Sequence, residues 1–272
     1  LPASHQATVM RAKGTPVDNI TPGDRAATQR RKLALIASQN TAFAHQSSDA
    51  QAIEAAITNY ETAFLMQTAV PDLADISGEP GHIRKLYGLD SPDEHQRLYA
   101  TQALRARRLV EAGVRFVEIT CPSFDGNNSP WDQHVQLKLN HEQNARITEQ
   151  SVAALIIDLH QRGMLDETIV LWAGEMGRTP HTPAVKEGCG RDHHVNGYSL
   201  FLAGGGFKGG TAYGETDEFG NAAVVNPTSV HDIHATILNQ MGIDHTKLTF
   251  RHGGRDQRLT DVHGHVIKTI LA

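Results

Sequence analysis

Acidic and histidine side chains recur in this sequence at spacings that suit metal binding. Asp132 and His134 are separated by one residue, and Asp192 and His193 are adjacent. Carboxylates and imidazoles are both ligands of divalent cations, so a loop that turns can bring the first pair to one ion. Glu175 adds a third acidic position. We therefore expect a divalent metal, Zn²⁺, Ca²⁺, Mg²⁺ or Mn²⁺, bound by Asp132, His134, Glu175, Asp192 and His193.

Two alternatives to a single shared ion stay open. Adjacent side chains of an extended strand point to opposite faces, so Asp192 and His193 bind one ion only if the backbone bends, and otherwise serve two. Each pair taken alone is also typical of a solvated surface loop. His231 and His234 share one face of a predicted helix, where they are either further ligands or surface histidines.

Cationic and proton-transferring side chains flank the same positions. Arg178 and Arg191 bracket the loop between the acidic groups. A guanidinium presents paired donors to sulfate, phosphate or carboxylate, so Arg178 is predicted to hold an anion. The alternative is a structural salt bridge with Glu175 or Asp192. His193 or His194 is predicted to assist proton transfer, and Arg178 and His194 are the catalytic residues of this interpretation.

Short apolar runs are predicted to position these groups. Residues 168–173 and 198–203 are β-branched and aromatic runs bounded by glycine and polar clusters, and residues 114–120 form a third such run. A helix predicted at 140–162 separates two of these strands, which is the pattern of a right-handed βαβ unit. We therefore expect a mostly parallel α/β sheet, with the polar groups in the crevice beyond the strands' carboxyl ends.

Helical periodicity dominates the rest of the chain. Two helices are predicted between residues 28 and 68 with a break at 45–49, and a third at 93–112 after a linker at 70–92 that contains proline and glycine. Thr228 or Ser229 is predicted to cap a helix at 230–241, and a hairpin is expected at 211–225. We expect residues 1–112 to form a helical and extended segment on the sheet of residues 113–272, together one structural domain.

Composition narrows the classes of protein. The 272 residues are 39% hydrophobic with a net charge of −5, which fits a globular protein and gives no indication of nucleic-acid binding. No run approaches the roughly 18 apolar residues of a membrane span, and two cysteines are too few for a disulfide framework. Gly204, Gly206 and Gly209 match a dinucleotide-binding pattern, but no suitable helix follows, so a tight turn is predicted instead.

Several motifs resemble a known family. The segments WDQH, TIVLWAGEMGRTP, GRDHHVNGYSLFLAGGGFKGG and HDIHATILNQMGIDH are similar to the sulfatase-like family of unknown function, domain of unknown function 1501, in the alkaline phosphatase superfamily. YETAFLMQ, RKLYGLD and ARRLVEAGVRFVE extend the likeness over most of the chain. The resemblance implies an alkaline-phosphatase-like sheet flanked by helices, a divalent metal centre at the strand ends, and a periplasmic or exported protein.

The sequence departs from that superfamily at two places. Glu175 and Met176 stand where its enzymes usually carry Asp-His or Asp-Asn, and nothing upstream of Val114 resembles the opening strand that bears the nucleophile. We therefore expect that the chain is the C-terminal part of a longer protein and lacks the opening strands. We expect either that residues 1–30 cover the sheet edge exposed in this way or that the chain self-associates through it.

The resemblance and the candidate site together suggest one activity, and two alternative functions stay open. We expect a metal-dependent hydrolase of sulfate or phosphate esters, acting on a small anionic ester that Arg178 holds. The alternative is a non-catalytic metal- or anion-binding domain of the same fold. A structural domain without a metal is the third possibility, which requires the acidic and histidine pairs to be coincidental.

Overall fold

The chain divides into two compact units. A computed structural model describes residues 7–18, 20–21, 23–44, 50–121, 123 and 130–272. The units are Leu1–Ile119 and Thr120–Ala272. Among the described helices, none combines the length and the apolar run that a bilayer crossing requires.

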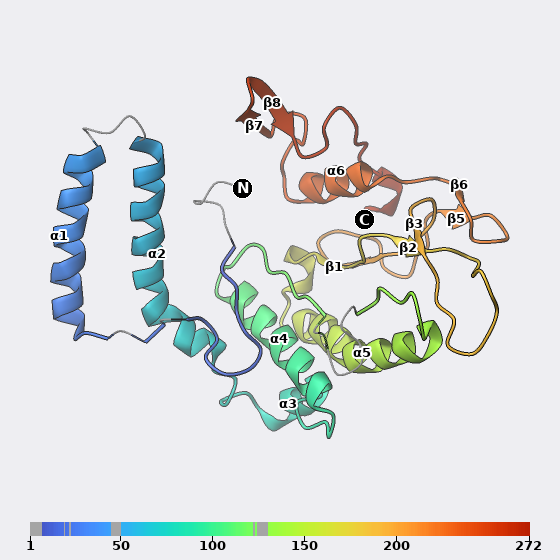
Figure 1. Cartoon of the computed structure of the whole chain (residues 1–272), viewed down its shortest axis with the longest axis horizontal. Coiled ribbons are helices and arrows are strands. Elements are labelled where there is room, and N and C mark those ends of the chain that lie inside the picture. The colour runs from blue at the N-terminus through green and yellow to red at the C-terminus, as the bar shows by residue number, and fades with distance from the viewer. Residues whose placement is uncertain (1–6, 19, 22, 45–49, 122, 124–129) are drawn as a thin grey trace. The chain divides into compact units, whose positions relative to one another are not determined.

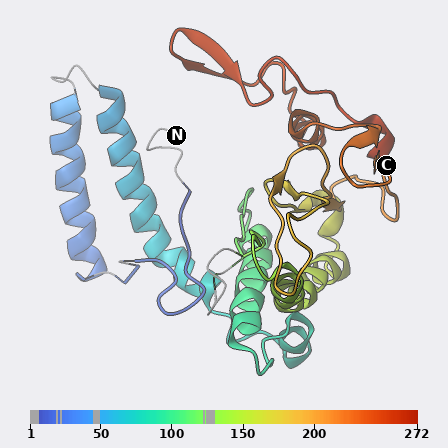
Figure 2. The same ribbon diagram turned by 45° about the vertical axis from the view of Figure 1, so that its right-hand side comes forward.

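The first unit is helical. Its helices are α1 (Ala26–Ala44), α2 (Ala50–Ala74), α3 (Gly81–Tyr87) and α4 (Glu94–Glu111). Helices α1 and α2 lie side by side as an antiparallel pair (Figures 1 and 2). The predicted helices before residue 68 and at 93–112 are confirmed, while the predicted break at 45–49 lies outside the described residues. Asp93 begins α4 by accepting backbone N–H bonds from His95 at 2.9 Å and Gln96 at 3.4 Å, which is a helix N-cap.

The segment between residues 70 and 92 is more helical than the sequence suggested. Its proline and glycine content predicted a linker, yet α2 continues to Ala74 and α3 occupies much of the remainder. Gly88 ends α3 in the left-handed conformation, with φ of 87°. Glycine adopts this conformation without steric conflict, so here it ends a helix instead of marking an extended linker.

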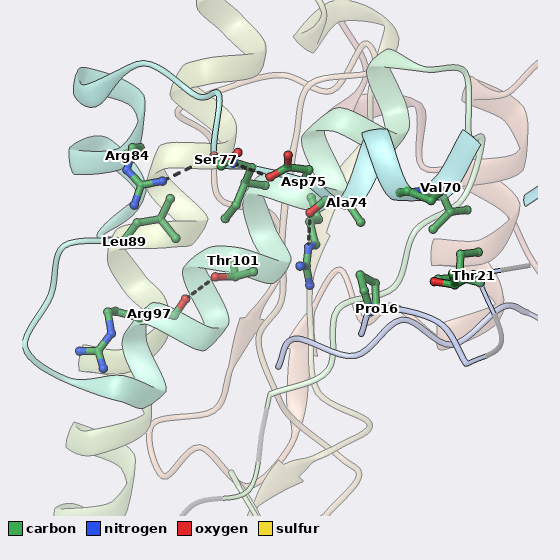
Figure 3. Close-up of a pocket in the computed structure, with 14 residues that line it drawn as sticks. Pro16, Thr21, Val70, Ala74, Asp75, Ser77, Arg84, Leu89, Arg97 and Thr101 are labelled. Atoms are coloured by element: carbon green, nitrogen blue, oxygen red, sulfur yellow. Dashed lines mark hydrogen bonds between the residues drawn. The ribbon is translucent and has the colours of Figure 1, made fainter. Parts of the chain in front are cut away.

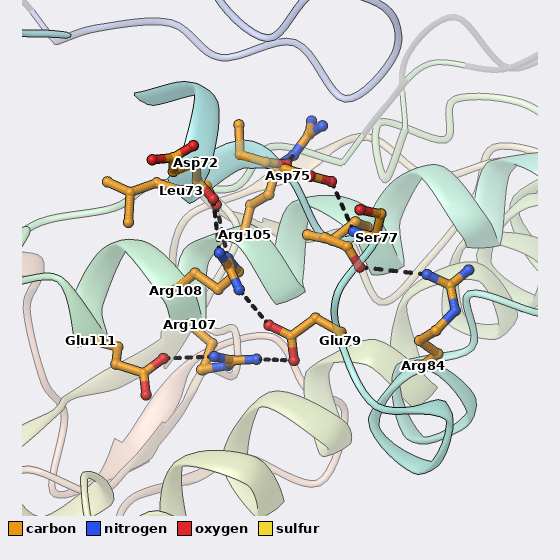
Figure 4. A network of polar contacts seen from close by, with 12 residues as sticks. Asp72, Leu73, Asp75, Ser77, Glu79, Arg84, Arg105, Arg107, Arg108 and Glu111 are labelled. Atoms are coloured by element: carbon orange, nitrogen blue, oxygen red, sulfur yellow. Dashed lines mark hydrogen bonds and ion pairs between the residues drawn. The ribbon is translucent and has the colours of Figure 1, made fainter. Parts of the chain in front are cut away.

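Apolar and ionic contacts both hold the first unit together. Ile20 packs with Val70 and Ala74 of α2 in a small buried cluster. Beside it, the buried carboxylate of Glu79 lies between the guanidinium groups of Arg107 and Arg108 (Figure 4). The Arg107 side chain is only 2% exposed, so this ion pair lies largely out of water.

Residues 114–120 form no strand in the structure, so the prediction of a core strand there is wrong. Phe116 is 79% exposed and Val114 is 39% exposed. A strand needs a neighbour to satisfy its backbone N–H and C=O groups, and none of the described strands pairs with this segment. The β-branched and aromatic run alone therefore did not determine the local structure.

The second unit combines two long helices with short strands. The helices are α5 (Leu137–Gln161) and α6 (Val230–Gln240), with 3₁₀ turns η2 (Leu165–Glu167) and η3 (Lys268–Ile270). The strands are β1 (Val170–Trp172), β2 (Gly177–Arg178), β3 (His193–His194), β4 (Phe201–Ala203), β5 (Glu215–Thr216), β6 (Ala223–Val225), β7 (Thr249–His252) and β8 (Arg255–Arg258). The predicted helices at 140–162 and 230–241 and the hairpin at 211–225 are confirmed.

Strand pairing differs from the expected parallel sheet. The described strands form four antiparallel pairs: β1 with β4, β2 with β3, β5 with β6, and β7 with β8. The mixture of helices and strands is confirmed, but the large parallel sheet is not found among the described residues. Parallel neighbours need a long crossover, usually a helix, and the connection from Trp172 to Phe201 contains no helix. Strand β4 therefore returns antiparallel to β1.

Two local predictions in this unit are confirmed. Ser229 caps α6, and a reciprocal bond between the Ser229 backbone N–H and the Asp232 carboxylate completes a capping box. Gly204 and Gly206 both have positive φ angles, and a Cβ on Gly204 would lie 2.3 Å from the Leu165 carbonyl oxygen. The glycines therefore form the predicted tight turn. Both Cys121 and Cys189 are free thiols.

Candidate metal centre

Two segments of the second unit run side by side and bring the candidate ligands together. The backbone N–H of Gln136 donates to the Gly188 carbonyl at 2.9 Å, and that of Leu137 to the Cys189 carbonyl at 3.2 Å. The N–H of Arg191 donates to the Gln133 carbonyl at 3.1 Å. These bonds run between residues 133–137 and residues 188–191. The loop that begins at Asp132 is thus held opposite the loop that ends at His193.

Gly190 makes this close approach possible. A Cβ at residue 190 would lie 1.9 Å from the carbonyl carbon of His134 and 2.0 Å from its oxygen. Contacts this short cannot be tolerated against backbone atoms, so a side chain at this position would push the two segments apart. Glycine is required here by the approach of another backbone.

A short antiparallel pair adds the arginine. In the β2–β3 ladder, Arg178 lies opposite His193. The backbone N–H of Thr179 donates to the Asp192 carbonyl at 2.8 Å, and the Thr179 hydroxyl accepts the Asp192 N–H at 3.1 Å. The ladder therefore sets Arg178 beside the acidic and histidine groups.

Three ligand atoms converge at the centre of this arrangement. The Oδ1 atom of Asp132 lies 3.1 Å from Nε2 of His134 and 2.9 Å from Nε2 of His193. The two Nε2 atoms lie 3.3 Å apart. All three side chains are partly exposed, so an ion can reach them from solvent. Within the described residues, no other group of three acidic, histidine or cysteine side chains meets so closely. We call Asp132, His134 and His193 the ligand triangle.

A second carboxylate fixes one imidazole of the triangle. Oδ1 of Asp192 lies 3.1 Å from Nδ1 of His134. An N–H at Nδ1 of His134 would donate to this carboxylate and leave Nε2 as the ligating atom when a metal is bound. In metal sites a carboxylate commonly orients a ligating histidine in this way.

The guanidinium of Arg178 lies beside the ligand triangle. Nη1 of Arg178 lies 2.6 Å from Oδ1 of Asp132, and Nη2 lies 3.9 Å from Oε1 of Glu175. Hydrogen bonding from His193 lowers the pKa of Asp132, partial burial raises it, and Arg178 lowers it further. The net direction is below the ordinary value of 3.8, so Asp132 is ionised at neutral pH.

The donor set fits a divalent metal ion. Ligand atoms about 2.1 Å from one ion, in tetrahedral or octahedral directions, lie about 3.0–3.4 Å from one another. The three sides of the triangle, at 2.9, 3.1 and 3.3 Å, are close to this range. Two imidazoles and one carboxylate favour Zn²⁺ or another transition metal over Ca²⁺ and Mg²⁺, which prefer oxygen ligands.

The remaining predicted site residues lie outside the triangle. Glu175 lies 3.9 Å from Arg178, and its side chain is 66% exposed. His194 is buried, and its Nε2 lies 2.7 Å from the Asn221 carbonyl oxygen, so an N–H there donates to that backbone group. The alternation of β3 points His194 away from His193. His231 lies against His263, with ring centroids 5.3 Å apart, and neither belongs to the triangle.

An aromatic cluster beside the triangle was not anticipated from the sequence. Trp131 packs edge-on against Trp172 at a centroid distance of 5.6 Å, and Trp172 stacks on Phe201 at 5.8 Å. Trp131 has a φ of 68°, which is unusual for a bulky residue and places strain directly before Asp132. Its position immediately before the Asp-x-His pair was the only sequence signal for it.

Comparison with known proteins gives a family and no closer relative. Neither the curated proteins nor the solved structures contain a match to this chain. One family model, described as a protein of unknown function (DUF1501), matches residues 1–271. Because the match covers nearly the whole chain, this protein belongs to the DUF1501 family.

Proposed function

We propose that the ligand triangle binds one divalent metal ion and that the chain hydrolyses small sulfate or phosphate esters there. We further propose that the family is sulfatase-like and belongs to the alkaline phosphatase superfamily, and that the protein is periplasmic or exported. These assignments rest on the motif resemblance, while the metal site rests on the geometry of the side chains.

One observation carries the metal site. Nε2 of His134 lies 3.1 Å from the ionised Oδ1 of Asp132, and Asp192 offers an acceptor to Nδ1 on the other side of the ring. A metal ion, or a proton on Nε2, would join the two atoms at this distance. The Nε2 of His193, 3.3 Å from that of His134, supplies a third ligand atom, which favours a metal ion over a shared proton.

The surrounding residues define what the chain itself would do. When bound, a divalent ion would supply Lewis-acid polarisation of the ester oxygens. Arg178, with a side chain only 12% exposed, fixes a positive charge beside the triangle and would orient the anionic group. Asp192 would hold His134 in its ligating tautomer. We assign His194 to anchoring β3 through the Asn221 carbonyl, instead of to proton transfer.

A second candidate function is a binding domain that performs no reaction. The ion pair between Arg178 and Asp132 favours it, because the guanidinium already neutralises the ligand oxygen at 2.6 Å. In that case the site would hold a metal or an anion without turnover. The two functions differ in the activity of the metal-loaded chain.

Hydrolysis of 4-nitrophenyl sulfate and 4-nitrophenyl phosphate tests the proposal. The chain is stripped of metal and reloaded separately with Zn²⁺, Mn²⁺, Mg²⁺ or Ca²⁺. We expect turnover of one ester with at least one ion, and a loss of about tenfold or more in kcat/KM for Arg178→Gln. Arg146→Gln, on an exposed position of α5, is the matched control and should not change the rate. Metal binding without turnover would favour the non-catalytic domain, and no metal binding would exclude the metal-dependent hydrolase.

A further inference from the structure

The first unit contains a pocket of about 630 Å³ that lies outside the metal centre. Its walls come from the N-terminal segment, the end of α2, the turn after it, α3 and α4. Pockets that bind small organic molecules have volumes of roughly 300–1,000 Å³, so this one is large enough for such a ligand.

The lining has an apolar end and a cationic end. Pro16, Thr21 and Val70 lie toward one end of the pocket, and Arg84, Leu89, Arg97 and Thr101 lie toward the other (Figure 3). Ile20, Val70 and Ala74, which belong to the small buried cluster of this unit, supply the apolar surface. A ligand that fills the pocket therefore meets hydrocarbon on one side and guanidinium groups on the other.

The sequence of α4 explains why its arginines face the pocket. Arg97, Thr101 and Arg105 are spaced four residues apart, so they lie on one stripe of the helix. The neighbouring Arg107 and Arg108 project elsewhere and bind the carboxylate of Glu79. The helix thus separates its arginines into a set that is neutralised by a carboxylate and a set that lines the pocket.

The pocket arginines bind backbone carbonyls and no carboxylate. Arg97 donates to the Ser91 carbonyl at 2.6 Å, Arg105 to the Ala74 carbonyl at 2.9 Å, and Arg84 to the Ile76 carbonyl at 3.5 Å. In the part of the chain that the structure describes, none of the three forms an ion pair. These bonds hold the side chains in place without cancelling their charge.

The pocket lining contains one carboxylate, and its net charge stays positive. Asp75 accepts the backbone N–H of Ser77 at 2.9 Å, and hydrogen bonds from Ser77 hold its pKa below 3.8, so it is ionised. Arg105 is partly buried, and this burial lowers the pKa of its guanidinium. Three cationic side chains against one anionic side chain give the lining an excess of positive charge. An anion in the pocket would offset it.

We propose that this pocket binds a small amphipathic organic anion. A carboxylate or phosphate group of the ligand would lie at Arg84 and Arg97, and its apolar body would cover Ile20, Val70 and Ala74. This site is independent of the metal centre, because every lining residue belongs to the first unit.

Calorimetric titration of the full chain with octanoate tests the proposal. We expect saturable binding at one site, with 1-octanol, which has the same tail without a charge, and acetate, which has the charge without the tail, each binding at least tenfold more weakly. Arg84→Gln and Arg97→Gln should each weaken octanoate binding by about tenfold, since each removes a charged hydrogen-bond donor. Arg84→Lys should retain most of the affinity because it keeps the charge.

Control variants separate binding from folding. Arg31→Gln changes an exposed arginine of α1 in the same unit and should leave octanoate affinity unchanged. Far-UV circular dichroism of each variant verifies that the helices are intact. The proposal is overturned if the folded chain shows no saturable octanoate binding, if 1-octanol binds as tightly as octanoate, or if a folded Arg84→Gln or Arg97→Gln variant binds like the unaltered chain.

Discussion

Replacing Glu79 with glutamine should destabilise the first unit strongly. The Glu79 side chain is 4% exposed, and its two carboxylate oxygens lie 2.7 Å from Nη2 of Arg107 and 2.8 Å from Nη1 of Arg108. Glutamine keeps the shape but removes the charge, so both guanidinium groups lose their shared counter-ion (Figure 4). Breaking a buried ion pair by removing one partner costs about 3–5 kcal/mol.

The remaining contacts of the two arginines place the effect at the lower end of that range. Arg107 keeps an ion pair with Glu111 at 2.6 Å, and Arg108 still donates to the carbonyls of Leu73 and Asp72 at 2.9 and 2.8 Å. We therefore expect a loss of about 3 kcal/mol, equivalent to a hundredfold or more in the opening equilibrium of α4. Glu111→Gln is the matched control, because this carboxylate is 44% exposed and its loss should cost less than about 1 kcal/mol.

The effect should depend on pH in a defined direction. Burial raises the pKa of Glu79, but hydrogen bonds from Arg108 and Arg107 lower it more, so the folded-state pKa is below 4.5. A group with a lowered pKa stabilises the fold above its unfolded-state pKa, and this contribution is lost as pH falls through the folded-state pKa. The difference between the unaltered chain and Glu79→Gln should therefore be complete at neutral pH and shrink below pH 4.5.

Hydrogen exchange measured by mass spectrometry on peptides from α4 reports this loss directly. Because each variant is compared with the unaltered chain at the same pH, the intrinsic pH dependence of exchange cancels. The reasoning is refuted if Glu79→Gln accelerates exchange in α4 no more than Glu111→Gln, or if its effect stays constant as the pH falls well below 4.5.

Three further predictions concern the second unit. Gly190→Ala should separate the two site segments and abolish metal binding. Gly209→Ala is the control, because the space around its Cβ position is open, and it should leave metal affinity unchanged. Equal metal affinities of the two variants would mean that Gly190 is not required for the close approach. Asp192→Asn should weaken metal affinity about 10–100-fold in calorimetric titration, because Asp192 orients His134, and an unchanged affinity would remove it from the site. Ser229→Ala should destabilise α6 by about 1 kcal/mol, measured by hydrogen exchange, and unaltered protection would mean that the cap contributes nothing.

The helices could be predicted from the sequence because their signals are local. The periodic apolar positions and the Ser229 cap each act within one or two helical turns, and α4 and α6 begin close to where these signals indicated. Residues 114–120 show the limit of such signals. A β-branched pattern favours an extended strand but does not specify a partner, and none of the described strands pairs with this segment.

The types of residue in the candidate site could be predicted from the sequence, but the backbone contacts that bring them together could not. Asp132, His134 and His193 were predicted to lie together because parallel strands were expected to end at one edge of a sheet. The structure brings them together through antiparallel contact of two loop segments, which depends on the absence of a side chain at Gly190. That requirement concerns another part of the backbone, so no local pattern announces it. For the same reason, the sequence gives no sign that Glu175 lies outside the ligand triangle.

Adjacent side chains of a strand point to opposite faces, and this rule explains which of the neighbouring site residues can share an ion. Alternation predicted that Asp192 and His193 would not both bind one ion without a bend. In the structure His193 joins the ligand triangle, and Asp192 instead hydrogen-bonds Nδ1 of His134. The same rule separates His194 from His193, so it explains why the predicted proton-transfer histidine lies apart from the ligands.

Metal stoichiometry tests the central proposal most directly. The full chain is stripped with a chelator, incubated with excess Zn²⁺, separated from free ion by gel filtration and analysed for bound metal, with affinity measured by calorimetry. We predict one Zn²⁺ per chain, and a loss of at least a hundredfold in affinity for Asp132→Asn, His134→Ala and His193→Ala. Glu142→Gln, an exposed acidic position on α5, should bind like the unaltered chain. Absence of stoichiometric binding of Zn²⁺, and equally of Mn²⁺, Mg²⁺ and Ca²⁺, or undiminished binding by the three ligand variants, would contradict the proposed centre.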